Sequence, residues 1–264
     1  MVVNKPMIGV AAAVVVVAGA VGFYFHSHRA PPPSVPTAPA PVAGEAAPSV
    51  AHPLPEASPG AAAAAPLPAL NDSDTSLLES LAQLAGAAAV KDYLQPESVV
   101  RHLVVTIDNL PRQKVAVEKR PTSAVPGSFA ATGDELHATL DKRNFDRYQP
   151  MVAVIHDLDM QKLAAVYVHF YPLFQQSYQD LGYPNGYFND RLVQVIDVML
   201  ATPQPAGAVE LVRPNVMYTF ADPALESRPA GQKLLIRMGP ENAAVINEKL
   251  MQLRAIIAAS PPKH

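Results

Sequence analysis

Apolar and polar residues follow a helical rhythm along most of the chain from Leu70 onward. Apolar side chains recur three or four residues apart, the spacing that lines one face of an α-helix. The last such stripe runs through Ile246, Leu250, Leu253 and Ile257. Comparable stripes predict helices near residues 75–85, 97–110, 142–158, 160–181, 190–201 and 231–239. The pattern therefore predicts an all-α fold, with one multi-helix globular domain over residues 70–264 and a minor extended arm near residues 208–222.

Prolines interrupt two of these helical stretches. Pro150 lies inside the stretch 142–158, and its missing N–H predicts a short helix, a break and a second short helix. Pro172 predicts a kink in the long helix that begins after Asp159, whose carboxylate can cap that helix. One face of the long helix is expected to carry Leu163, Val166, Phe170, Phe174 and Leu181. An irregular, proline-containing connection earlier in the chain has room for one short strand, at Val115–Val117.

The most distinctive polar cluster is the sequence GYPNGYFND, just before one of the predicted helices. We expect Asn189 or Asp190 to cap this helix by accepting hydrogen bonds from its free N–H groups. Gly186 provides the preceding turn, and Tyr187 with Phe188 anchors the entry to the core. The alternative is a polar pocket for a small ligand or a partner's peptide, formed by Tyr183, Tyr187, Asn189, Asp190 and Arg191.

A second candidate site lies at the joint before the last helix. Gly239 and Pro240 begin that helix, and its free N–H groups would suit an anion held beside Arg237. The structural alternative pairs Arg237 with Glu241 or with a nearby carbonyl group. These two residues complete the set of candidate binding positions.

The N-terminus contains a stretch that predicts a membrane span. Ile8 to Phe25 is a run of 18 residues without a charge, and a bilayer core requires about 20 apolar residues in a helix. We therefore expect residues 1–29 to be a transmembrane anchor, with the N-terminus in the cytoplasm and the rest of the chain outside it. The rival interpretation is a cleaved signal peptide, because Ala18-Gly19-Ala20 fits a cleavage site. Both interpretations export the downstream domain.

Residues 30–69 are rich in proline and alanine and almost free of charge. Proline fixes the backbone and lacks a donor, so neither a helix nor a sheet is expected here. The composition predicts a disordered linker that spans about 3.1 Å per residue where it is extended. Such a linker holds a domain away from a membrane surface.

Composition and motifs exclude several functional classes. The net charge of −3 gives no basic face for nucleic acid, and the absence of cysteine excludes disulfides and thiolate chemistry. None of the common hydrolase, zinc-protease or nucleotide-binding motifs occurs. We therefore expect no catalytic residue, no metal site and no cofactor.

Several long segments resemble a bacterial family known only as domain of unknown function 3014. They are LPALNDSD, IDNLPR, LGYPNGYFNDRLVQVIDVMLATP and MYTFADPALESRPAGQKLLIRMGPENAAVINEKLMQLR, within Leu67 to Arg254. The resemblance implies a single-span envelope protein with an exported C-terminal domain, and it implies no activity.

Three functional hypotheses follow. The first is a non-catalytic domain, tethered to the bacterial inner membrane and lying in the periplasm, that binds an envelope protein or a cell-wall component. The second is a hydrolase of cell-wall glycan or peptide, which needs a buried acid with a raised pKa in a cleft. The third is a self-associating structural protein of the envelope.

Overall fold

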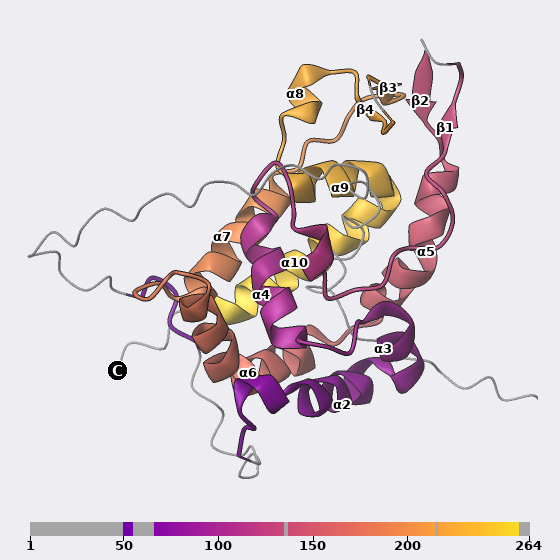
Figure 1. Cartoon of the computed structure of the whole chain (residues 1–264). Coiled ribbons are helices and arrows are strands. Elements are labelled where there is room, and N and C mark those ends of the chain that lie inside the picture. The colour runs from indigo at the N-terminus through magenta and orange to yellow at the C-terminus, as the bar shows by residue number, and fades with distance from the viewer. Residues whose placement is uncertain (1–49, 55–65, 135–136, 215, 259–264) are drawn as a thin grey trace, which may run out of the picture.

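The computed structural model describes residues 50–54, 66–134, 137–214 and 216–258. Figure 1 shows a helical body from which a small sheet projects at one end. The helices are α2 (Asp74–Ala85), α3 (Ala87–Tyr93), α4 (Val99–Asn109), α5 (Arg143–His156), α6 (Met160–Asp180), α7 (Phe188–Leu200), α8 (Pro223–Glu226), α9 (Ala230–Met238) and α10 (Pro240–Ile257). The strands are β1 (Ala131–Thr132), β2 (Ala138–Leu140), β3 (Glu210–Val212) and β4 (Thr219–Phe220).

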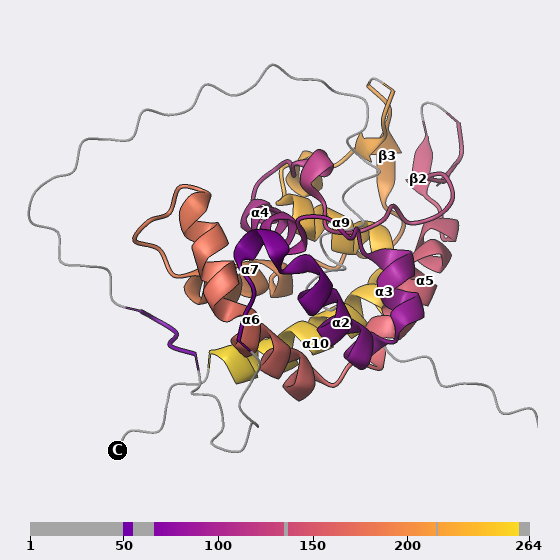
Figure 2. The ribbon, with the colours of Figure 1, turned by 60° about the horizontal axis from the view of Figure 1, so that its bottom comes forward.

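Helix α10 lies at the centre of the helical body. It contacts α5, α6, α7 and α9, and it runs diagonally through the body in both views (Figures 1 and 2). Its predicted apolar stripe is confirmed, because Ile246, Leu250, Leu253 and Ile257 are all buried. Each aliphatic side chain buried in this way contributes about 1.5–3 kcal/mol. The stripe therefore organises the core around one helix.

The expected extended arm is part of a small antiparallel sheet, so the fold is mostly helical rather than all-α. The strand order is β1-β2-β3-β4, which joins two hairpins from distant parts of the sequence. Ala138, Leu211 and Phe220 from the sheet pack against Ile236 of α9. The strands have only two or three residues each, too few for alternation to predict them.

The break expected at Pro150 does not occur. Helix α5 continues from Arg143 to His156 with Pro150 inside it. Pro150 and Asp146, whose carbonyl group loses its helical partner to the proline, both lie on the exposed face. Water can therefore solvate the free carbonyl group, while Met151 and Ile155 are buried on the opposite face.

Two local expectations are also wrong. Val115–Val117 is not a strand, because its backbone turns into a 3-10 helix over Val117–Lys119. Leu181 is exposed, at 39% of its surface, because α6 ends one residue earlier. The cap at the other end of α6 is confirmed, since the carboxylate of Asp159 accepts from the N–H groups of residues 161 and 162.

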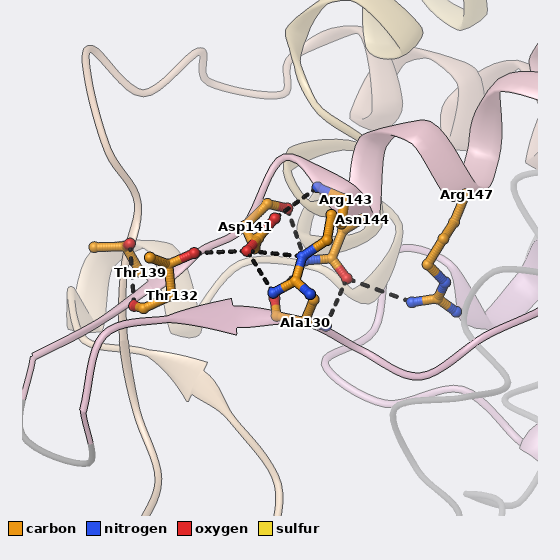
Figure 3. Close-up of polar contacts among 7 residues, drawn as sticks. All are labelled: Ala130, Thr132, Thr139, Asp141, Arg143, Asn144 and Arg147. Carbon is orange, nitrogen blue, oxygen red and sulfur yellow. Dashed lines mark hydrogen bonds and ion pairs between the residues drawn. The ribbon is translucent and has the colours of Figure 1, made fainter.

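A polar cluster around Asp141 joins the sheet to the start of α5 (Figure 3). The Asp141 carboxylate accepts hydrogen bonds from the Thr132 hydroxyl at 2.6 Å and from the Arg143 backbone N–H at 2.7 Å. The Arg143 guanidinium donates to the same carboxylate at 2.8 Å. The Asn144 amide bonds both backbone groups of Ala130. These contacts fix the β1–β2 hairpin to the helical body.

This cluster predicts a pH dependence of stability. Hydrogen bonds from the Arg143 side chain, and then from Thr132, hold the pKa of the Asp141 carboxyl well below its ordinary value. Because the unfolded pKa is about 3.9, the stabilisation is complete above that pH and is lost as the pH falls toward the lower folded value. We expect Asp141→Asn to lower the urea midpoint at pH 7 and to approach the wild-type midpoint in acid. Parallel midpoint curves from pH 7 to pH 3 would contradict this assignment.

Within the residues that the structure describes, no helix combines the length and the apolar character needed to cross a bilayer. The predicted span, Ile8 to Phe25, and most of the predicted linker lie outside those residues. Residues 50–54 are the one described part of that linker before residue 66.

Candidate functional site

The predicted cap at the start of α7 is wrong. The helix begins at Phe188, its N-cap residue is Tyr187, and the Tyr187 side chain makes no capping hydrogen bond. Asn189 and Asp190 thus lie inside the first turn. The N–H of Phe188 instead donates to the side-chain oxygen of Gln175 on α6 at 2.8 Å. Phe188 is fully buried. The helix therefore begins at this core residue, one and two positions before the residues expected to cap it.

Aromatic packing and Gln175 hold this helix start in place. Phe188 stacks on Phe174 with ring centroids 5.7 Å apart, as expected for the residue that anchors the entry. The Gln175 amide also donates to the Gly186 carbonyl at 2.7 Å. The expected turn is present, since the Gly186 N–H donates to the Tyr183 carbonyl at 3.0 Å. These contacts fix the entry to α7 against α6.

Two of the predicted pocket residues belong to a buried ion cluster centred on Asp108 of α4. The Asp108 side chain is only 3% exposed and accepts from Arg191 at 2.9 Å and from Arg112 at 2.7 Å. The Tyr183 hydroxyl donates to the same carboxylate at 3.3 Å. Arg191 also donates to the Asp108 backbone carbonyl at 2.7 Å. Tyr183 and Arg191 are thus engaged in joining α4 to α7.

Asn189 and Asp190 have a different role, and they hold a remote segment of polypeptide. The Asp190 carboxylate accepts the backbone N–H of Ala51 at 3.1 Å and that of His52 at 2.7 Å, each on a separate oxygen. The Asn189 amide donates to the His52 carbonyl at 2.8 Å. Three backbone groups of two successive residues are therefore bound by two adjacent side chains. We call Asn189 and Asp190 the α7 clasp.

The clasp is oriented by groups behind it. Asn189 is 1% exposed, and its amide nitrogen also donates to the Ile257 carbonyl at the end of α10, at 3.0 Å. The Tyr167 hydroxyl donates to the Asn189 side-chain oxygen at 3.1 Å. Burial raises the pKa of Tyr167 well above its ordinary value, so this phenol remains a donor. The hydrogen bond from Tyr167 fixes the orientation of the amide, so the Asn189 nitrogen faces the bound segment and Ile257.

The structure does not bring the second candidate site to the clasp. Arg237 is buried, its guanidinium lies 4.3 Å from the centre of the Phe220 ring, and it donates to the Lys233 carbonyl at 3.4 Å. The nearby-carbonyl alternative is therefore what the structure shows. Glu241 is exposed in the first turn of α10. Arg237 contacts Phe220 of the sheet, and the sheet lies at the end of the helical body away from α6 (Figure 1).

Among the described residues, no three histidine, aspartate or glutamate side chains are grouped so that they could hold a metal ion. The sequence analysis missed several polar residues around this site, among them Gln175 and Asp108. Asp108 had a usable signal, because it follows Val104 by four positions on an apolar helical face. Gln175 had none, since it is one polar residue on a long helix.

Residues 99–254 match the protein family described as "Protein of unknown function (DUF3014)", and the resemblance expected from the motifs is confirmed. No curated protein and no solved structure matches the chain. Asn189 and Asp190 lie inside the matched stretch, whereas the segment they hold, residues 50–54, precedes it.

Proposed function

Because the chain belongs to the DUF3014 family, whose function is unknown, we propose its role from the geometry of the α7 clasp. The domain is a non-catalytic binding module that binds a polypeptide segment of an envelope partner. An N-terminal anchor tethers it to the bacterial inner membrane, and the domain lies in the periplasm. The protein thus serves as a tethered receptor for another envelope protein.

The observation that carries this proposal is the hydrogen bonding of Asp190 and Asn189 to backbone groups of residues 51 and 52. Hydrogen bonds to the main chain supply affinity in one recurring mode of peptide recognition. The N–H of Phe188 at the start of α7 is already bonded to Gln175. The side chains of Asn189 and Asp190 are therefore available to bind a segment rather than to cap the helix.

The location rests on the chain before the domain. The uncharged run Ile8 to Phe25 has the composition of a span, and the proline-rich stretch after it has the composition of a spacer. A binding module on such a spacer can reach partners at a distance from the bilayer. This arrangement favours a partner in the envelope over a cytoplasmic one.

Cell-wall hydrolysis has less support than binding. A glycan hydrolase needs a carboxylic acid whose pKa is raised by burial in a cleft. Among the described glutamates, Glu79, Glu97 and Glu241 lie exposed on the surface. Self-association remains an outcome of the experiment below.

Photo-crosslinking in intact cells tests the proposed function. A photoreactive residue replaces Gln194, which is exposed one turn after Asp190 on the same face of α7. The control position is Val216, which is 63% exposed between β3 and β4 of the sheet. We expect Gln194 to give adducts with a small set of envelope proteins that Val216 does not give. Identical adducts at both positions, or adducts only with a second copy of the chain, would overturn the proposal.

A further inference from the structure

The segment seated in the α7 clasp reveals which polypeptide the clasp selects. We infer that the clasp binds a segment of the form x-x-Pro-aliphatic, in which neither x is proline, and that residues 50–54 of the chain itself are a resident competitor that a partner must displace. The inference rests on the proposed function for the existence of a partner. The selectivity itself follows from the contacts of Ala51 to Leu54.

The backbone contacts set the first requirement. A carboxylate accepts and cannot donate, so Asp190 requires an N–H from each of two successive residues, here Ala51 and His52. Proline has no N–H, and it is therefore excluded at both of these positions. It is allowed at the next position, where Pro53 stands, and there its ring restricts the backbone of the preceding residue.

The side chains set the second requirement. Exposure alternates along the segment, with Ala51 and Pro53 exposed and His52 and Leu54 partly buried. The backbone bends at Ala51 and His52, and both of their N–H groups reach the Asp190 carboxylate. Leu54 packs against the main hydrophobic core. The domain can therefore distinguish side chains at the two partly buried positions, those of His52 and Leu54.

Covalent connection gives the resident segment an advantage. A tethered ligand acts at an effective concentration on the order of millimolar, so a free copy of the same peptide displaces it only near that concentration. A partner must therefore bind more tightly than the resident segment or contact additional surface. For the same reason, a test of selectivity needs a chain whose own segment has been released.

The experiment uses the full chain in detergent with the substitutions Ala51→Pro and His52→Pro together. They remove both N–H donors from the resident segment without altering the domain. The probe is a fluorescent peptide of residues 47–57, APSVAHPLPEA, and its anisotropy is titrated. We expect saturable binding below about millimolar concentration to the released chain, at least tenfold tighter than to wild type. Adding Asp190→Asn to the released chain is expected to weaken binding at least tenfold, because asparagine has one acceptor oxygen and Asp190 uses two.

Matched peptides test the selectivity directly. A peptide with proline at both clamped positions is expected not to bind, and one with serine in place of Leu54 to bind at least tenfold more weakly. Equal binding with and without Asp190→Asn, or no binding to a released chain whose circular dichroism and thermal unfolding match wild type, would overturn the inference. Partner adducts at Gln194 in the latter case would leave the proposed function standing. Peptide binding without any partner adduct would overturn the function and keep the inference.

Discussion

Replacing Gly239 by alanine is expected to lower the free energy of unfolding by about 2–5 kcal/mol. Gly239 joins α9 to α10 with φ +86° and ψ 161°, a region of backbone space that is almost restricted to glycine. An added Cβ would also lie 2.5 Å from Cγ of the Phe145 ring. Phe145 cannot withdraw freely, because its carbonyl accepts a hydrogen bond from Asn242 at 2.9 Å. Urea unfolding of the full chain in detergent measures the loss.

Gly207→Ala is the matched control for this substitution. Gly207 also has a positive φ, +96°, but its added Cβ would meet nothing within 4 Å. Only the backbone cost should remain, roughly 1–2 kcal/mol. Equal losses in the two variants would show that the contact between Gly239 and the Phe145 ring does not contribute to the joint of α9 and α10.

The second large effect is expected at Asp108, where alanine should cost about 3 kcal/mol, near the lower end of the range for breaking a buried ion pair. The loss arises because Arg191, whose side chain is 18% exposed, keeps its charge without the carboxylate. Partial solvation of Arg191 moderates the penalty. The measurement is again the free energy of unfolding.

Arg112→Ala is the control for the Asp108 cluster. Arg112 binds the same carboxylate, but its side chain is 53% exposed, so its removal is expected to cost at most about 1 kcal/mol. Asp108→Asn should fall between the two, since it keeps one acceptor for Arg191. An Asp108→Ala loss no larger than that of Arg112→Ala would mean that the cluster does not fasten α4 to α7.

The helices were predictable because their signal is local. The stripe of α10 and the cap at Asp159 depend on residues within a few positions of one another, and both are confirmed. The sheet was not predictable, because its pairing joins β2 to β3 across some seventy positions, with strands of two or three residues. The break predicted at Pro150 was wrong for a related reason. Whether proline breaks a helix depends on the exposure of the face that carries it.

The sequence indicated where the polar side chains gather but not the role of each residue. The stretch GYPNGYFND does gather polar side chains, yet the structure divides them between the Asp108 cluster and the α7 clasp. The contact between Asp190 and His52 spans 138 positions. It also uses only backbone groups of the bound segment, and every residue except proline has those groups. Such recognition leaves no pattern that sequence spacing can reveal.

The most direct measurement of the central claim is amide hydrogen exchange at Ala51 and His52 in the full chain. If the clasp holds this segment, both amides exchange at least about tenfold more slowly than in the free peptide, and Asp190→Asn removes the protection while the amides of α7 stay protected. Exchange at the rate of the free peptide in wild type, or loss of α7 protection together with that of residues 51 and 52, would contradict the claim that Asp190 binds polypeptide rather than building its own helix.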